Sequence, residues 1–180
     1  MNGIKFTPFP ILKTERLELR RLSDNDKDTI FLLRSNESIK KYIDRPLINT
    51  IEEAIEFITR INNGIQEDKL IYWAISFKEN PELIGTICLW NFSSENQSAE
   101  LGYELRPNFQ GQGFMTEAIN CVIQYAFKNI AIKTLEAYTH KDNLNSVRLL
   151  EKNGFRLESH KIYEENLSFI IYSLTNKQVR

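Results

Sequence analysis

The residues whose types and spacing could do chemistry are concentrated between residues 106 and 118. Two glycines, Gly111 and Gly113, stand where an alternating, strand-like segment (99–105) ends and an amphipathic helix pattern begins. Glycine permits the tight turn that such a junction needs, and the first N–H groups of a helix have no partner within the helix. Because the helix dipole makes this end positive, it attracts anions. The segment therefore predicts a phosphate-bearing, nucleotide-like cofactor bound between Gln110 and Met115.

Length and composition describe a folded, soluble chain. The 180 residues are 42% hydrophobic and 26% charged, which suits one domain with a buried core and is neither a disordered nor a membrane composition. The formal net charge of −1 provides no overall attraction to nucleic acid or anionic lipid. No apolar run approaches the ~20 residues needed to cross a bilayer. We therefore expect a cytoplasmic protein without nucleic-acid or membrane partners.

Cysteine and histidine are too few and too scattered for a disulfide scaffold or a metal centre. Cys88 falls in an apolar, strand-like run and Cys121 in the amphipathic helix pattern. Both are expected to be small buried hydrophobic side chains. Neither a Cys-x-x-Cys pair nor closely spaced histidines occur. The sequence therefore predicts no metal ligands.

The hydrophobic periodicity predicts one mixed α/β domain over residues 1–180. Residues 1–13 are expected to form an extended arm, because Pro8 and Pro10 bar a regular helix, and residues 14–174 to form the core. Strand-like alternation on both sides of the central helix predicts a parallel pair in an otherwise antiparallel sheet. The helix that begins near residue 49 is expected to end at Asn62–Gly64. Strands are expected at 14–22, 70–77, 83–90, 99–105, 134–139, 155–163 and 167–173, helices at 23–36, 49–64, 115–127 and 143–153, and a helical turn plus loop at 38–46.

Three sequence blocks resemble the GNAT family of acetyl-CoA-dependent N-acetyltransferases. Residues 110–115, Gln-Gly-Gln-Gly-Phe-Met, are similar to the family's Gln/Arg-x-x-Gly-x-Gly/Ala up to the last position, Met115. Residues 143–155 resemble Asn-x-x-Ser…Glu-Lys-x-Gly-Phe. Residues 14–20 resemble the Thr-Glu-Arg-Leu-x-Leu-Arg of the RimJ/RimL-like branch, which includes enzymes that acetylate the N-terminal amine of ribosomal proteins. The resemblance covers residues 14–173. It implies a mixed, mostly antiparallel sheet of six to seven strands, flanked by about four helices and splayed at the fourth strand into a V-shaped cleft.

The resemblance also implies where acetyl-CoA would bind. Backbone N–H groups of residues 111–115 would hold its pyrophosphate, and the flexible Met115 side chain can point away from the phosphates. Asn143 and Ser146 would lie along the pantetheine arm, although Asn143 is equally suited to a helix N-cap and Ser146 to local hydrogen bonds early in a helix. The expected cofactor-binding residues are Leu105, Gln110, Gly111, Gln112, Gly113, Phe114, Met115, Asn143 and Ser146.

Transfer to an amine requires a base, because an amine attacks a thioester only when it is neutral. Glu100 and Glu104 alternate onto one face of a predicted strand, and each could be an ordinary solvated carboxylate. A partly buried carboxyl group would have the raised pKa that suits a base, and the Ala-Glu-Leu-Gly-Tyr context of the family branch favours Glu100. The tyrosine that many members use to protonate the departing thiolate is replaced by Leu150, and Ser146 or Tyr138 could substitute for it.

The resemblance therefore implies an enzyme that moves an acetyl group from acetyl-CoA to a primary amine by direct attack, with no covalent enzyme intermediate. Backbone amides of the fourth strand would position the thioester. The acceptor is either a protein N-terminus or a small-molecule amine. Because Leu150 replaces the usual acid, a domain that binds and senses CoA without turnover is the alternative. The predicted edge strands and C-terminal hairpin are compatible with a homodimer.

Overall fold

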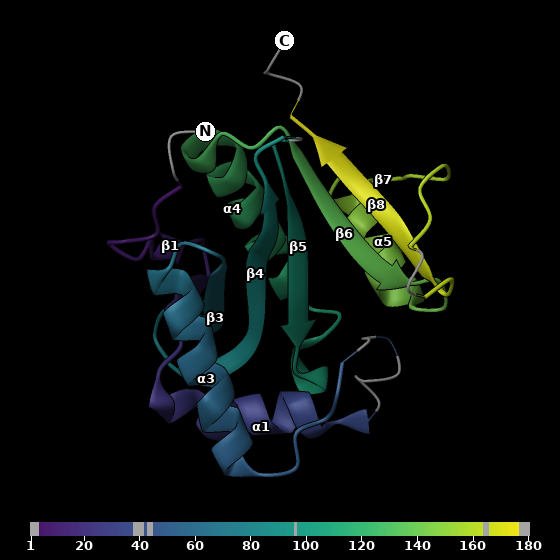
Figure 1. The fold of residues 1–180 in the computed structure, drawn as a ribbon. Coiled ribbons are helices and arrows are strands. Elements are labelled where there is room, and N and C mark those ends of the chain that lie inside the picture. Colours follow the sequence, from purple (N-terminus) through teal and green to yellow (C-terminus); the bar gives the residue numbers. More distant parts are fainter. Residues whose placement is uncertain (1–3, 38–41, 43–44, 96, 164–165, 177–180) are drawn as a thin grey trace.

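The structure is a computed structural model that describes residues 4–37, 42, 45–95, 97–163 and 166–176. Its centre is an eight-stranded sheet with the order β1-β2-β3-β4-β5-β6-β8-β7 (Figure 1). Neighbouring strands are antiparallel except for β5 and β6, which are parallel. The predicted mixed, mostly antiparallel sheet is confirmed. The strands are β1 (Leu12–Lys13), β2 (Leu17–Arg20), β3 (Ile71–Phe77), β4 (Leu83–Ser93), β5 (Ser98–Leu105), β6 (Thr134–His140), β7 (Arg156–Leu157) and β8 (Phe169–Thr175).

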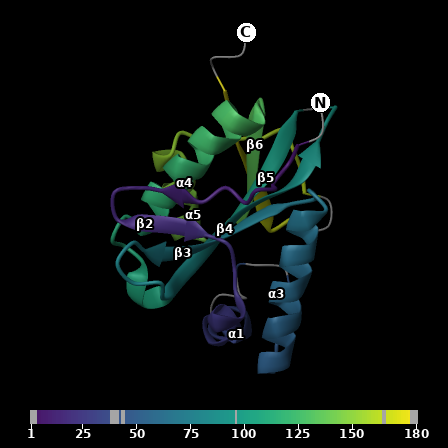
Figure 2. The ribbon, with the colours of Figure 1, turned by 90° about the vertical axis from the view of Figure 1, so that its left-hand side faces the viewer.

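Helices cover both faces of the sheet, as Figure 2 shows. On one face, Phe57 of α3 meets the ring of Tyr72 edge-on, with 5.7 Å between centroids. On the other face, Tyr125 of α4 meets the ring of Trp73 in the same way at 5.6 Å. Tyr72 and Trp73 are neighbours on β3, and successive side chains of a strand point to opposite faces. We call these the α3 face and the α4 face. The helices are α1 (Lys27–Ser35), α3 (Ile51–Gln66), α4 (Phe114–Tyr125) and α5 (Leu144–Lys152), with 3-10 turns η1 (Asp24–Asp26) and η2 (Pro107–Phe109) and a π-helical segment η3 (Ala126–Ile130) that continues α4.

The N-terminal arm is part of the folded core. Phe6 is buried and its ring lies 5.6 Å from that of Phe92, and Trp73 donates a hydrogen bond from Nε1 to the Pro10 carbonyl at 2.8 Å. The end of the arm forms β1, which pairs with β2. The sheet therefore has one strand more than the six to seven expected, and the predicted extended arm supplies it.

The end predicted for α3 is wrong. Asn62–Gly64 was expected to end this helix, but it continues to Gln66. Ile65 extends the apolar stripe and is buried. A Cβ at Gly64 would lie only 3.0 Å from the Leu70 side chain. Gly64 therefore allows the chain entering β3 to pack closely against the helix and does not end it.

Other expectations have plainer outcomes. Cys88 and Cys121 are free and partly buried. The turn and loop predicted for residues 38–46 lie largely outside the described residues. In the ranges that the structure describes, no helix is long and apolar enough to cross a membrane.

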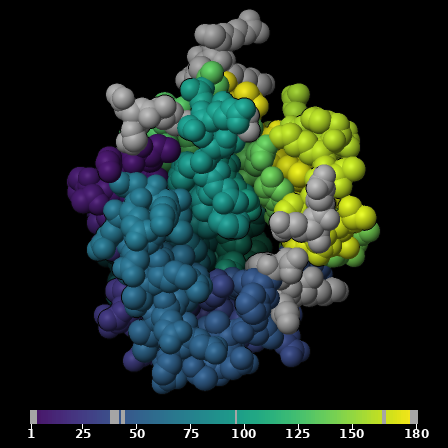
Figure 3. Space-filling view, viewed as in Figure 1, coloured from purple at the N-terminus to yellow at the C-terminus, as the bar shows by residue number. Residues whose placement is uncertain are grey.

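The sheet opens between β5 and β6. These strands pair only where Ser98–Glu100 meets Thr134–Glu136, whereas β5 remains paired with β4 as far as Leu105 and β6 with β8 as far as His140. The two strands separate as a V in Figure 1, and Figure 3 shows the surface hollowed between them, above α1. The predicted splay at the fourth expected strand, β5, is confirmed.

Candidate active site

The predicted phosphate turn joins β5 to α4 through η2. Gly111 and Gly113 have positive φ angles of 74° and 81°, a backbone conformation that few residues except glycine adopt. Gly113 is the N-cap of α4, and its carbonyl accepts a helical bond from the Glu117 N–H at 3.0 Å. The N–H groups of residues 114–116 therefore have no carbonyl partner within the helix. They make the start of α4 a donor site for an anion.

The side chains of Phe114 and Met115 point into the core, away from the open side of the turn. The irregular residue of the motif, Met115, therefore does turn its side chain away. A Cβ placed on Gly111 would meet no heavy atom within 4 Å, which shows that the space over this residue is open. Gln110 is turned back toward β5, where its Nε2 donates to the Leu105 carbonyl at 3.0 Å. The predicted turn residues therefore lie together around one open position.

The block at residues 14–20 ties this turn to the sheet. Glu117, the acidic residue in the first turn of α4, accepts hydrogen bonds from Thr14 Oγ1 at 2.5 Å, from Arg16 N at 2.8 Å and from Arg16 Nε at 2.7 Å. Arg16 also donates from Nη1 to the Gln112 carbonyl at 3.3 Å. Burial alone would raise the pKa of Glu117, but the hydrogen bonds from Thr14 and Arg16 lower it. The carboxylate beside the anion site is therefore paired with a cation, a role for Arg16 that the sequence did not reveal.

One edge of β5 presents backbone groups to the open V. The Arg106 N–H donates to the Ile84 carbonyl of β4 at 2.9 Å. Along an antiparallel strand the backbone groups point alternately to one side and the other. Those that point away from β4, toward the gap beyond Glu100, belong to Leu101, Tyr103 and Leu105. A ligand in the V can pair with this edge, which leads directly into the glycine turn.

Asn143 and Ser146 lie across the gap, at the start of α5. Asn143 is the N-cap of this helix, and its Oδ1 accepts a hydrogen bond from the Ser146 N–H at 3.2 Å. Ser146 Oγ lies 2.7 Å from Tyr103 Oη, so a hydroxyl pair joins α5 to β5 across the V. Burial raises the pKa of Tyr103 to about 12, although the bond to Ser146 lowers it. The sequence did not single out Tyr103; its only signal was its position on the strand.

Glu100 lies where β5 and β6 part, on the α3 face. It stands opposite Glu136 of β6, and its Oε2 accepts a hydrogen bond from Asn91 Nδ2 at 3.0 Å. Burial raises the pKa of Glu100 to about 7; the hydrogen bonds from Asn91 and Trp90 lower it, and the charge of Glu136 raises it further. A carboxyl group with a pKa near neutrality can take up and release protons at ordinary pH, as a catalytic base must.

Glu104, two positions beyond Gly102 on the same face, is held in an ion pair. Its Oε1 and Oε2 accept hydrogen bonds from Arg45 Nη1 and Nη2 at 2.5 and 2.6 Å, and Arg34 Nη1 lies 3.9 Å from Oε1. A bidentate pair engages both oxygens of the carboxylate. The two carboxyl groups that strand alternation makes equivalent therefore differ: Glu104 binds an arginine, whereas Glu100 binds a neutral amide.

The positions considered for the proton donor also differ. Leu150 is fully buried in the hydrophobic core. Tyr138 donates from its hydroxyl to Glu136 Oε2 at 3.2 Å, and Glu136 is also paired with Lys161 at 2.5 Å. Burial, followed by the charge of Glu136, raises the pKa of Tyr138 to about 12. Tyr138 is therefore engaged with β6 and its neighbours, whereas Ser146 is the candidate bonded to β5.

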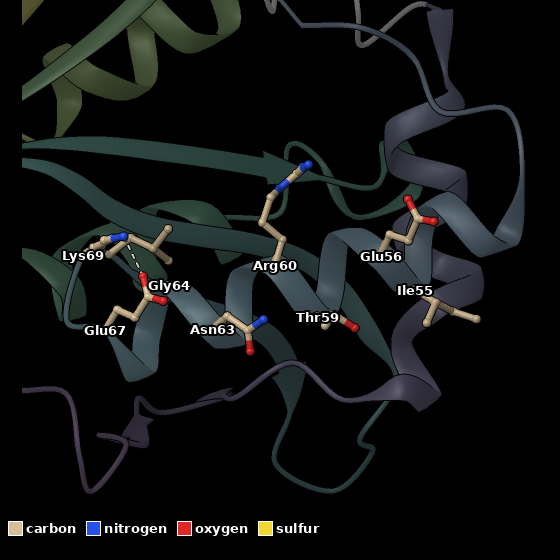
Figure 4. Close-up of a pocket in the computed structure, with 9 residues that line it drawn as sticks. Ile55, Glu56, Thr59, Arg60, Asn63, Gly64, Glu67 and Lys69 are labelled. Atoms are coloured by element: carbon tan, nitrogen blue, oxygen red, sulfur yellow. Dashed lines mark ion pairs between the residues drawn. The ribbon is translucent and has the colours of Figure 1, made fainter.

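A separate pocket of about 570 Å³ lies along α3 (Figure 4). Its walls come from α3 and from the segment that enters β3, near the ion pair between Glu67 and Lys69 at 2.6 Å. None of the predicted site residues lines it. Among the residues that the structure describes, no cluster of three or more His, Cys, Asp or Glu side chains is arranged to hold a metal ion.

Comparisons with known proteins identify the family. The family described as acetyltransferase (GNAT) domain matches residues 16–156. The chain is 37% identical over 150 residues to the uncharacterized N-acetyltransferase YoaA of Bacillus subtilis (strain 168), a match that covers 83% of this chain and 85% of YoaA. It is 26% identical over 147 residues to the ribosomal-protein-serine acetyltransferase of Escherichia coli (strain K12), covering 81% of this chain and 82% of that protein.

Solved structures share the fold. RimL, a ribosomal L7/L12 alpha-N-protein acetyltransferase solved in complex with coenzyme A, matches with a TM-score of 0.80 and 19% identity, over 92% of this chain and 98% of RimL. The resemblance inferred from the three sequence blocks, including that to the RimJ/RimL-like branch, is confirmed by these relatives. With its splayed sheet and its glycine turn, the chain belongs to the GNAT family of N-acetyltransferases.

Proposed function

We propose that this protein transfers the acetyl group of acetyl-CoA to a primary amine, as one catalytic domain. The observation that carries the proposal is the course of β5. Beyond Glu100, the edge of β5 that points away from β4 pairs with no strand in the described part of the chain. Glu100 projects from the α3 face of β5, and the end of the strand leads through η2 into the glycine turn of α4. One strand therefore provides a backbone surface for an extended ligand, a base and an anion site.

The successive parts of acetyl-CoA match the glycine turn, the free edge of β5 and the region near Glu100. Its anionic pyrophosphate suits the N–H groups of residues 111–115, where the space over Gly111 is open. The amide groups of its extended pantetheine arm can pair with the outward backbone groups of β5, as an added strand would. Asn143 and Ser146 border the same gap. When bound, acetyl-CoA supplies a thioester, which is an acyl group activated for attack by an amine.

Glu100 is the proposed base. A primary amine is largely protonated at neutral pH, so a proton must leave before the nitrogen can attack. A carboxylate whose pKa is about 7 accepts that proton, directly or through water, more readily than one with the ordinary value of 4.5. The nitrogen then forms a bond to the carbonyl carbon and the carbon–sulfur bond breaks. The departing thiolate needs a proton in its turn.

Ser146 is the proposed donor of that proton. Its hydroxyl lies beside β5, at 2.7 Å from the hydroxyl of Tyr103. A serine hydroxyl alone is a weak acid, but Tyr103 can pass its own proton to Ser146 as Ser146 protonates the sulfur. Tyr103 then takes up a proton from solvent. Glu100 releases to solvent the proton that it accepted from the amine, so the enzyme returns to its starting state. Tyr103 is therefore a positioning residue that acts through Ser146.

The proposed acceptor is a protein N-terminus or a small-molecule amine. The Escherichia coli relative is named for transfer to a serine of a ribosomal protein, which supports the first of these. YoaA is named only as an N-acetyltransferase. Both classes therefore belong in the acceptor panel that tests the proposal.

A thiol-release assay with acetyl-CoA and a panel of N-terminal peptides, polyamines and amino acids tests the function. We expect release that depends on an amine and falls by about 10²- to 10⁴-fold in Glu100→Gln. Glu79→Gln, which changes an exposed carboxylate in the turn between β3 and β4, is the matched control and should retain full activity. CoA binding without thiol release across the panel would overturn the proposal and identify a CoA-binding domain without turnover.

A further inference from the structure

The α3 face of β5 continues past the proposed base toward a second charged group. Glu100, Gly102 and Glu104 lie in succession on this face. Gly102 has no side chain, and a Cβ there would lie 2.9 Å from the Cys88 sulfur. In the proposed function, on which this inference rests, the acceptor amine meets the thioester near Glu100. The surroundings of Glu104 are therefore positioned to select among acceptors.

Among the residues that the structure describes, cations outnumber carboxylates around Glu104. Arg45 engages both oxygens of this carboxylate, and Arg34 Nη1 lies 3.9 Å from one of them. All three side chains are largely buried, with exposed fractions of 13% for each arginine and 10% for Glu104. Arg60, which is exposed and so is not part of this buried cluster, lies 5.6 Å from the Phe57 ring over which Arg34 is stacked at 3.9 Å. One carboxylate thus balances two buried guanidinium groups.

Arg34 is the member of this cluster whose hydrogen-bonding capacity is unused. Within the described part of the chain its guanidinium donates no hydrogen bond; its contacts are the 3.9 Å approach to Glu104 and the stacking on Phe57. Its Nε is buried without a partner, as is the Nε of Arg45, and a buried donor in a protein is normally satisfied. Arg45 uses its two Nη groups on Glu104, whereas those of Arg34 donate to no residue in the described part of the chain. Burial, and then the charge of Arg45, lower the pKa of Arg34, as expected where a cation lacks its own anion.

We infer that Arg34 binds an acidic group of the acceptor, so that the enzyme acetylates primary amines that also carry a carboxylate or a phosphate. The planar guanidinium matches both groups through paired hydrogen bonds. From Glu100 to Glu104 the strand rises by about 14 Å. The stretch between the base and Arg34 therefore has room for the amine and the acidic group of one acceptor, either a small molecule or the first residues of a peptide.

Matched acceptors test the role of this charge. O-phosphoethanolamine is compared with ethanolamine, and a peptide that begins Ser-Asp with one that begins Ser-Asn, in the thiol-release assay. We expect the acidic member of at least one pair to have a KM lower by about tenfold or more, the effect of one charge-assisted hydrogen bond. The pair that shows the difference identifies phosphate or carboxylate as the group. Equal KM values within both pairs would overturn the inference.

Variants of Arg34 locate the effect. Arg34→Met removes the charge but keeps an unbranched chain over Phe57, so it should abolish the preference by raising the KM of the acidic acceptor to that of the neutral one. Glu104 keeps its bidentate pair with Arg45 in this variant, so the protein should still fold. Arg34→Lys should restore part of the preference, and Arg60→Met, the matched control on the same ring, should retain all of it. A lower Tm with an equal loss for both acceptors would show a structural role and contradict the inference.

A binding measurement separates failure of this inference from failure of the proposed function. Where no acceptor supports thiol release, calorimetric titration of the CoA-loaded protein with O-phosphoethanolamine and ethanolamine still reports the site. Binding of the acidic compound alone, lost in Arg34→Met, supports the site in a protein that transfers no acetyl group. Equal binding of the two compounds, or binding of neither, overturns it.

Discussion

Replacing Glu100 by glutamine should make the protein a slower enzyme and, at alkaline pH, a more stable one. The pKa of Glu100 is about 7 instead of the ordinary 4.5, so between these values the folded protein retains a proton that the unfolded chain has lost. The ionised form is thus disfavoured in the folded state. Because the folded-state pKa is raised, stability should fall as the pH rises from about 4.5 to about 7. Glutamine is neutral throughout and avoids this loss.

The size of the effect follows from the same two values. The difference between a pKa of 4.5 and one of about 7 corresponds to about 3 kcal/mol of unfolding free energy once the carboxyl is fully ionised. Glu100 is partly exposed, so solvent screening reduces this figure, and we expect Glu100→Gln to be more stable by about 1–2 kcal/mol at pH 8. At pH 4, where the carboxyl is protonated in the folded protein, the two proteins should differ by less than about 0.5 kcal/mol.

Catalysis should change in the opposite direction. The kcat/KM of the wild type should rise with pH through about 7 as Glu100 loses its proton. Glu100→Gln should lack this rise as well as being slower. Asn91→Gly removes a hydrogen bond that lowers the pKa of Glu100 and suits the positive φ of 47° at this position, so it should move the rise to higher pH by about one unit. Thiol-release rates across the pH range and urea unfolding at pH 4 and pH 8 provide both measurements.

Two results would refute this reasoning. Full activity of Glu100→Gln, or a pH rise that it still shows, would remove Glu100 as the base. If Glu100→Gln were destabilised equally at pH 4 and pH 8, the Glu100 side chain would serve the fold as a hydrogen-bond acceptor. Burial would then not raise its pKa. Glu79→Gln, whose carboxylate is exposed, should change neither quantity.

Three further outcomes are expected. Asparagine and aspartate both tolerate the positive φ of position 113, but only aspartate adds a negative charge at the start of α4. Calorimetry should therefore show about tenfold weaker CoA binding for Gly113→Asp than for Gly113→Asn. Ser146→Ala should lower kcat by about 100-fold, and Tyr103→Phe should have little added effect in the Ser146→Ala background, as a double-mutant cycle can measure. Trp73→Ala removes a fully buried side chain and should lower the free energy of urea unfolding by about 3–5 kcal/mol.

Most elements of the fold could be predicted because their signals are local. Alternation along 99–105 identifies a strand wherever the rest of the chain lies. The helix that follows, and the strand after it, require a crossover, which makes β5 and β6 parallel. Gly64 shows the limit of local signals. It follows two asparagines and resembles a helix terminator, but the burial of Ile65 and the contact with Leu70 decide where α3 ends.

The glycine turn could also be predicted from local sequence. The contacts that hold it in place could not. Positive φ angles and a helix start are properties of the segment itself. The contacts of Arg16 with Glu117 join residues 101 positions apart, and the hydroxyl pair of Tyr103 and Ser146 joins residues 43 apart. Such contacts depend on how β2, α4 and α5 pack. The block containing Arg16 was identified by resemblance alone, and its physical role follows from the structure.

Glu100 and Glu104 show why residue type and strand position do not determine chemistry. They are the same residue, on the same face of the same strand, and the sequence offers no physical means of separating them. Arg45, 59 positions before Glu104, donates hydrogen bonds to both oxygens of that carboxylate, so neither oxygen is free. Glu100 is buried beside an amide and another carboxylate instead, which makes its ionisation unfavourable. That unfavourable ionisation lowers the stability of the fold at neutral pH, and it is also the property that lets Glu100 accept a proton from an amine.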